Sequence, residues 1–196
     1  PHALWLDSSH DAHAAARSSY IATRPHQIIS GAPEHARRHF EAADSALASG
    51  AGLWQDLPPE IDAQVPSFRG GLAGFFGYDL ARGLHPMSDN INRNAHDDLG
   101  LPGLTLGLYA TVLAFNMRSR RAFIIATGLP ETDPKARRQQ AESDIVEWQN
   151  RLDRLTDKPR PVAFSDAPLR ARHPPQSNFT AQGFRETVMQ VVERIL

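Results

Sequence analysis

The stretch "SFRGGLAGFFGYD", Ser67–Asp79, places four glycines and three phenylalanines within thirteen residues. A dinucleotide-binding loop requires G-x-G-x-x-G between a strand and a helix, and a phosphate-binding loop requires G-x-x-x-x-G-K-[ST]. The glycines here, Gly70, Gly71, Gly74 and Gly77, match neither spacing, and no Lys-Ser/Thr pair follows them. We therefore expect a structural role, in which glycine lets a strand kink or lets another backbone or an aromatic ring approach closely.

The composition is that of an ordinary globular protein. The 196 residues suit one domain, or one domain with an appendage. With 21 basic and 22 acidic side chains the formal charge is −1, which favours neither nucleic acid nor an anionic membrane as a partner. The chain has no cysteine, so disulfides, thiolate metal ligands and a cysteine nucleophile are excluded. With no apolar run of about 20 residues and no signal peptide, we expect a cytoplasmic protein.

Hydrophobic periodicity predicts an α+β fold with largely antiparallel, sandwich-like sheets and flanking helices. The apolar positions of the helix expected over residues 33–50 are Ala36, Phe40, Ala43 and Leu47. The expected elements are short strands over residues 3–9, 18–24 and 26–30, the helix over 33–50, a hairpin of the β-rich runs 104–116 and 122–128, and an amphipathic helix over 133–155.

The C-terminal region reads as a separate piece of the chain. Residues 156–177 are proline-rich and aperiodic, which predicts a linker between an N-terminal domain over 1–155 and a helix over 178–196. Thr180 is the expected N-cap of that helix. Its apolar stripe consists of Phe184, Val188, Val191, Val192 and Ile195. A helix with such a stripe needs a partner surface, so we expect the sequence to be truncated.

Metal binding has weak support in the sequence. His10 and His13, and His35 and His39, form two pairs, and the second has the i, i+4 spacing that metalloproteases use on a helix. The run reads "HARRH", without the glutamate of H-E-x-x-H, and no third ligand is evident. Surface histidines are the favoured interpretation, and no metal site is predicted.

The sequence shows no constellation for nucleophilic catalysis either. No G-x-S-x-G motif occurs, and serines close to histidines are too common to be informative. Arg118, Arg120 and Arg121 form a basic cluster that suits either an anion site or the solvated turn of a hairpin. We expect no catalytic residue in this chain.

Several motifs, in order along the chain, resemble the N-terminal region of chorismate-utilising enzymes, the family of component I of anthranilate synthase and of aminodeoxychorismate synthase. "FRGGLAGFFGYDLAR", residues 68–82, is similar to the family pattern F-x-G-G-x-x-G-x-x-G-Y-D-x-x-R. The other matching segments are "ALWLDSS" at 3–9, "RSSYIATRP" at 17–25, "DDLGLPGLTLGLYATVLAFN" at 97–116 and "SNFTAQGFRETVMQVVERI" at 177–195. Within the glycine pattern, Tyr78 and Asp79 join the four glycines as structural motif residues. We expect Phe75, Phe76 and Tyr78 to pack where sheet elements meet.

The resemblance implies the N-terminal α+β domain of an enzyme whose following catalytic domain holds chorismate and Mg²⁺, with residues 178–196 as the first helix of that domain. With ammonia from a glutaminase subunit, the whole enzyme would aminate chorismate to 4-amino-4-deoxychorismate for folate synthesis, the reaction that the N-terminal spacing favours. The alternatives are anthranilate synthase component I and a stand-alone ligand-binding domain. The fragment itself would be non-catalytic.

The resemblance also implies a ligand pocket. In this family the N-terminal domain holds L-tryptophan, and the matching positions here are Ser8, Arg17, Ser18, Ser19 and Tyr20. Hydroxyl and strand-end backbone groups would hold the ammonium and carboxylate, and Tyr20 would line a slot for the indole. The simpler alternative is that Ser19 and Tyr20 alternate across a half-buried strand.

Overall fold

The computed structural model describes residues 2–8, 17–50, 57–85, 99–155 and 176–195. The chain divides into two compact units, Pro1–Asp157 and Lys158–Leu196. The predicted linker lies almost wholly outside the described residues, which exclude 156–175. Within the described part of the chain no helix is both long and apolar enough to cross a membrane.

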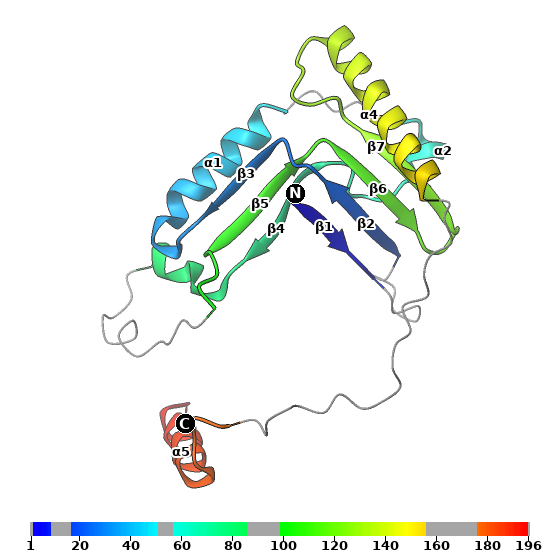
Figure 1. Cartoon of the computed structure of the whole chain (residues 1–196). Helices are drawn as coiled ribbons and strands as arrows, with labels where there is room; N and C mark the ends of the chain where they lie inside the picture. Colours follow the sequence, from blue (N-terminus) through cyan, green and yellow to red (C-terminus); the bar gives the residue numbers. More distant parts are fainter. Residues whose placement is uncertain (1, 9–16, 51–56, 86–98, 156–175, 196) are drawn as a thin grey trace. The chain divides into compact units, whose positions relative to one another are not determined.

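The first unit is an α+β domain with two antiparallel sheets, as the sequence predicts (Figure 1). Its elements are β1 Ala3–Leu6, β2 Ser18–Thr23, β3 Gln27–Gly31, η1 Pro33–His35, α1 Ala36–Ala48, α2 Pro59–Asp62, β4 Gly71–Phe76, η2 Tyr78–Gly83, β5 Leu104–Tyr109, β6 Thr111–Asn116, β7 Arg121–Ala126 and α4 Pro134–Arg154. The strand orders are β1-β2-β6-β7 in the first sheet and β3-β5-β4 in the second.

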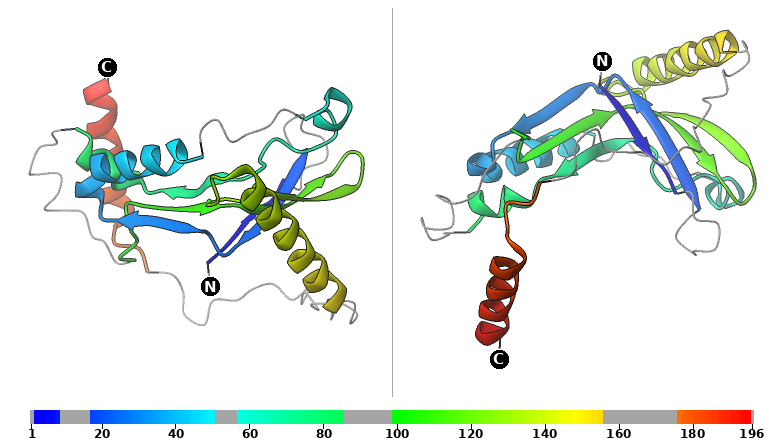
Figure 2. Two further views of the ribbon diagram at one scale, coloured as in Figure 1. Left: turned by 90° about the horizontal axis from the view of Figure 1, so that it is seen from above. Right: turned by 60° about the horizontal axis from the view of Figure 1, so that its bottom comes forward.

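Each sheet has a helix on one face (Figures 1 and 2). Helix α1 contacts all three strands of the second sheet, and α4 contacts β6 and β7 of the first. The opposite faces meet in a shared apolar cluster, in which Ala22, Val112 and Ala114 of the first sheet pack with Tyr109 of the second. This cluster joins the two sheets into one folded unit.

The β-rich run 104–116 forms two strands, although its unbroken pattern predicts one. Strand β5 ends at Tyr109 in the second sheet, and β6 begins at Thr111 in the first. The segment between β2 and β3 also passes from the first sheet to the second, through Arg24 and Pro25. Arg24 has a φ of 55°, which lies in the left-handed region. At Gly107 an added Cβ would lie 2.8 Å from the Tyr109 ring and 3.0 Å from Pro25 Cβ, so glycine makes room for both at the bend.

Helix α1 buries a face slightly different from the predicted one. Ala36, Ala43 and Ala46 are buried against Ile29 and the leucines of β5, and Phe40 is partly buried beside them. Leu47, predicted to face the core, is 48% exposed, since the helix presents Ala46 to the sheet instead. Small alanines let the helix axis lie close to the strands, and this leaves the larger Leu47 at the margin.

The two C-proximal helices begin as the sequence predicts. In α4 the Asp133 carboxylate accepts a hydrogen bond from Ala136 N at 2.9 Å and caps the helix. In α5, Ala181–Ile195, Thr180 Oγ1 accepts one from Gly183 N at 3.0 Å. Within its own unit α5 has no buried residue, and its stripe from Phe184 to Ile195 is exposed.

Candidate functional site

The end of β1 and the start of β2 are fastened by one buried hydroxyl group. Ser19, which is 6% exposed, donates from Oγ to Asp7 Oδ1 at 2.7 Å and accepts from the backbone N–H of Ser8 at 3.2 Å. The β1–β2 register pairs Leu6 with Tyr20, so continuing it by one residue sets Asp7 opposite Ser19. Asp7 therefore places a carboxylate beside Ser8 and Ser19, two of the residues that are predicted to bind tryptophan.

Tyr20 is held by contacts with the start of the glycine-rich run. Its hydroxyl lies 3.4 Å from Ser67 Oγ and accepts from Phe68 N at 3.4 Å. Its ring meets the Phe68 ring edge-on, with the centroids 5.6 Å apart. Burial raises the pKa of Tyr20, but hydrogen bonds from Ser67, Ser18 and Phe68 outweigh burial and leave this pKa below its usual value of 10.0. The tyrosine thus joins two segments that are 48 residues apart in the chain.

The five residues that are predicted to bind tryptophan fall into two groups. Alternation along β2 places Ser18 and Tyr20 on the face of the shared apolar cluster, and Ser19 on the other face beside Asp7. Ser8 belongs with Ser19 through its backbone N–H. Arg17 precedes β2 with an exposed side chain, and its carbonyl accepts from Met117 N at 2.9 Å. The Tyr20 ring and the Ser19 hydroxyl therefore lie on opposite sides of one strand.

The glycines of the opening stretch allow unusual backbone conformations and a close strand approach. Gly70 and Gly71 have φ values of 123° and 111°, which L side chains rarely adopt. At Gly74 an added Cβ would lie 1.9 Å from Thr105 O on the neighbouring strand β5. At Gly77 it would lie 3.0 Å from Gly103 O, and Gly77 N donates to that carbonyl at 2.7 Å. No phosphate-cradling geometry is needed to explain these glycines.

The aromatic residues of the stretch do not all pack as expected. Phe76 stacks on Phe40 of α1, with ring centroids 5.9 Å apart and 15° between the planes. Tyr78 is 99% exposed, so the expectation that it packs where sheet elements meet is wrong for the described structure. The next residue, Asp79, pairs with Arg82 at 2.9 Å within η2, and this turn presents the Tyr78 ring to solvent.

The other candidate residues form no ligand cluster. Among the described residues no three His, Cys, Asp or Glu side chains could hold a metal ion, and His10 and His13 lie outside them. His39 is not the surface histidine that the sequence predicts, because its Nε2 is buried near Gly31. In the basic cluster, the Arg121 guanidinium is hydrogen-bonded to Gln64 Oε1 and lies 5.4 Å from the Phe123 ring centroid.

The geometry defines an α+β domain with two hydroxyl-rich contact regions, one at Ser19 and one at Tyr20. Comparison with known proteins shows which sequences the chain is similar to. No protein-family model matches the chain. The chain is 28% identical over 169 residues to "Anthranilate synthase alpha subunit 2, chloroplastic" of Arabidopsis thaliana, covering 81% of this chain and 26% of that protein. It is 32% identical over 92 residues to "Anthranilate synthase component 1" of Acinetobacter calcoaceticus, covering 46% and 18%.

A crystal structure of anthranilate synthase component I from Streptococcus pneumoniae TIGR4 aligns with 74% of this chain and 33% of its own, with 19% identity and a TM-score of 0.45. The sequence similarities support a relationship with anthranilate synthase component I proteins. They do not single out the aminodeoxychorismate enzymes. The chain spans about a quarter or less of the curated relatives it matches.

Proposed function

We propose that this chain is the N-terminal domain of component I of a chorismate-utilising enzyme. The observation that carries the proposal is the alignment over 81% of the chain with an anthranilate synthase alpha subunit. The ordered motifs, with the glycine-rich run among them, support it independently. In this proposal the whole enzyme adds ammonia from a glutaminase subunit to chorismate. By the resemblance, Mg²⁺ and chorismate would bind in the remainder of the enzyme.

Two reactions fit this proposal. Anthranilate formation has the stronger support, because the curated relatives from Arabidopsis, Acinetobacter and Oryza are anthranilate synthases. Aminodeoxychorismate formation remains the second candidate, on the start "PHALWLDSS" and its compact spacing to "RSSYIATRP". The two differ in the product that is formed from one substrate.

The products decide between these candidates. The protein encoded by the complete reading frame that contains this chain is purified. It is incubated with chorismate, Mg²⁺ and ammonium, with and without an aminodeoxychorismate lyase. Anthranilate in both reactions indicates anthranilate synthase, and para-aminobenzoate only with the lyase indicates aminodeoxychorismate synthase. The 196-residue chain alone should form neither product. If the complete protein converts no chorismate, the proposed enzyme class is wrong.

We also propose that L-tryptophan binds at the end of β1 and the start of β2, on the face that carries Ser19, on the resemblance and on the Asp7 carboxylate beside Ser8 and Ser19. Tyr20 lies on the other face of β2 and is not part of this proposed contact. An amino acid ammonium group needs such an anionic partner. Isothermal titration of the complete protein with L-tryptophan should give saturable heat. Asp7→Asn should weaken binding by at least tenfold. Ser30→Ala, which removes a hydroxyl pair with Thr105 on another strand, should leave it unchanged. Absence of heat with the wild-type protein would refute tryptophan binding.

A further inference from the structure

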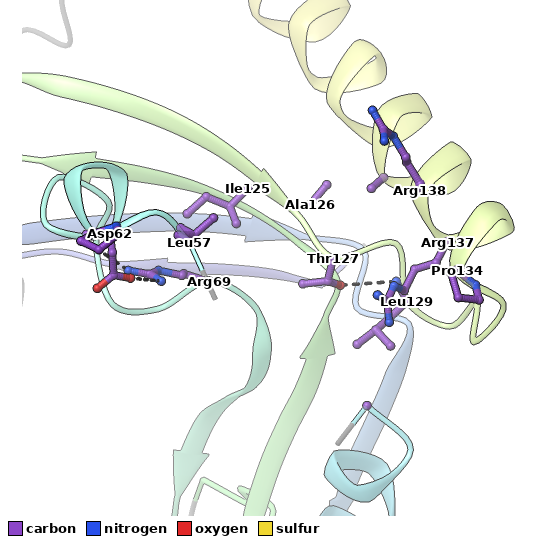
Figure 3. Close-up of a pocket in the computed structure, with 13 residues that line it drawn as sticks. Leu57, Asp62, Arg69, Ile125, Ala126, Thr127, Leu129, Pro134, Arg137 and Arg138 are labelled. Atoms are coloured by element: carbon purple, nitrogen blue, oxygen red, sulfur yellow. Dashed lines mark hydrogen bonds and ion pairs between the residues drawn. The ribbon is translucent and has the colours of Figure 1, made fainter. Parts of the chain in front are cut away.

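A pocket of about 900 Å³ lies between the end of β7, the first turns of α4 and the segment that contains α2 (Figure 3). Its size falls in the range of small-molecule sites. Ser8 and the four residues Arg17–Tyr20 do not line it, so it is separate from the proposed tryptophan site. The proposed function assigns no role to this pocket.

Three arginines line the pocket, and two of them have carboxylate partners. Arg69 pairs with Asp62 at 2.6 Å, and Arg138 pairs with Glu142 at 2.9 Å. Arg137 differs from both, since its Nη1 is buried with no hydrogen-bond partner among the described residues. A buried guanidinium N–H without an acceptor is unfavourable. Arg137 as a whole is only half-buried and lines the pocket, so an anion there could contact the accessible part of the same guanidinium and balance its charge.

The position of Arg137 is set by the turn before α4. Gly128, with φ at 73°, packs so closely that an added Cβ would lie 2.0 Å from Arg137 O and 2.7 Å from its Cγ. Arg137 N donates to Asp133 O at 2.9 Å. The side chain therefore leaves a fixed backbone, which favours a preorganised contact with a ligand.

The remaining walls favour a ligand with one charge and an apolar body. Leu57, Ile125, Leu129 and Ala141 contribute apolar surface. The Thr127 hydroxyl is already used, because it donates to Ala110 O at 3.1 Å and accepts from Leu129 N at 3.3 Å. Among the lining residues that the structure describes, Arg137 is the arginine without a carboxylate partner, and one such cation in an otherwise apolar or charge-balanced wall matches one anionic group.

We propose that this pocket binds a small monocarboxylate with an apolar body, whose carboxylate pairs with the Arg137 guanidinium. A phosphate dianion fits less well, since Arg69 and Arg138 are neutralised by their own partners. The site would be a second ligand site on this domain, independent of the reaction that the complete enzyme performs.

The test is a titration of the full 196-residue chain, labelled with ¹⁵N, with benzoate, benzamide and inorganic phosphate. Benzoate should shift the amide resonances of residues 125–129 and 136–141 in a saturable way. Benzamide, which has the same ring and no charge, and phosphate should each bind at least tenfold more weakly. Arg137→Gln should weaken benzoate binding by at least tenfold, and Arg154→Gln, at the far end of α4, should not change it.

Stability separates a ligand site from a structural role of Arg137. Without ligand, Arg137→Gln should unfold at an unchanged or higher temperature, because it removes an unpaired buried donor. If Arg137→Gln does not fold, Ala141→Phe tests the site instead, since the added ring occupies the pocket while Arg137 remains. The proposal is overturned if benzoate gives no saturable shift, if benzamide or phosphate binds as well as benzoate, or if Ala141→Phe leaves the binding of benzoate intact.

Discussion

The substitution Gly74→Ala tests the structural role of the glycine-rich run most directly. The new Cβ would lie 1.9 Å from Thr105 O, and real Cβ contacts essentially never fall below 3.0 Å, so β4 and β5 would have to separate by about 1 Å. Such a shift breaks the ladder hydrogen bonds on either side of Gly74 and loosens the packing of Leu72 and Leu106. Two lost hydrogen bonds and the disturbed packing amount to about 2–4 kcal/mol of unfolding free energy.

Urea denaturation followed by far-UV circular dichroism measures this loss. With a slope of about 2 kcal/mol per molar urea, the midpoint should fall by about 1–2 M. Gly50→Ala is the matched control, because its added Cβ would meet Leu129 at 3.5 Å, an ordinary van der Waals distance. We expect that variant to stay within about 1 kcal/mol of the wild type, or to gain stability through a less flexible unfolded chain. A Gly74→Ala midpoint equal to that of Gly50→Ala would refute the close-approach argument.

Three further predictions concern single side chains. Ser19→Ala should lower the unfolding free energy by about 1–2 kcal/mol in urea denaturation, because it removes the partner of Asp7, and this loss should shrink in an Asp7→Ala background. In a spectrophotometric pH titration, Tyr20 should ionise at lower pH than the tyrosines of an unfolded chain, and Tyr109 at higher pH. The variants Tyr20→Phe and Tyr109→Phe assign the two transitions. Because burial raises the pKa of Tyr109, its contribution to stability is complete below about pH 10 and is lost as the pH rises through the folded-state pKa. Gly183→Ala should raise the helix content of a peptide of residues 176–195, by up to about 1 kcal/mol of helix stability in circular dichroism, and an unchanged spectrum would contradict this.

The sequence predicts those elements whose signals are local. Two short β-prone runs divided by Pro25 locate β2 and β3, and the hairpin of β6 and β7 follows from two apolar runs on either side of a basic turn. The cap of α5 follows from Thr180 ahead of the apolar stripe. The division of 104–116 at Ala110 was missed because the run contains neither proline nor a turn-forming pair there. The bend instead involves a contact distant in sequence, since Pro25 lies close to Gly107.

The site is less predictable than the fold, because its contacts depend on register. Asp7 stands one residue before the predicted Ser8, and nothing in the local sequence indicates that it faces Ser19. Only the pairing of β1 with β2 brings Asp7 and Ser19 together, and the sequence of two short strands does not reveal which residues pair. The pocket at Arg137 is even harder to predict from sequence, because its walls come from three separate segments, around residues 57–69, 125–129 and 134–141.

The contact between Tyr20 and Phe68 joins two motifs that look independent in the sequence. "RSSY" supplies the hydroxyl and the ring, and "SFRGG" supplies the backbone N–H and the opposing ring. Gly70 and Gly71 follow Arg69 in the same run, with positive φ values where the chain enters β4. A ligand that binds beside β2 would therefore act on a strand whose tyrosine also holds the start of β4. The contact of Phe68 with Tyr20 is therefore a structural link between β2 and the residues that lead into β4.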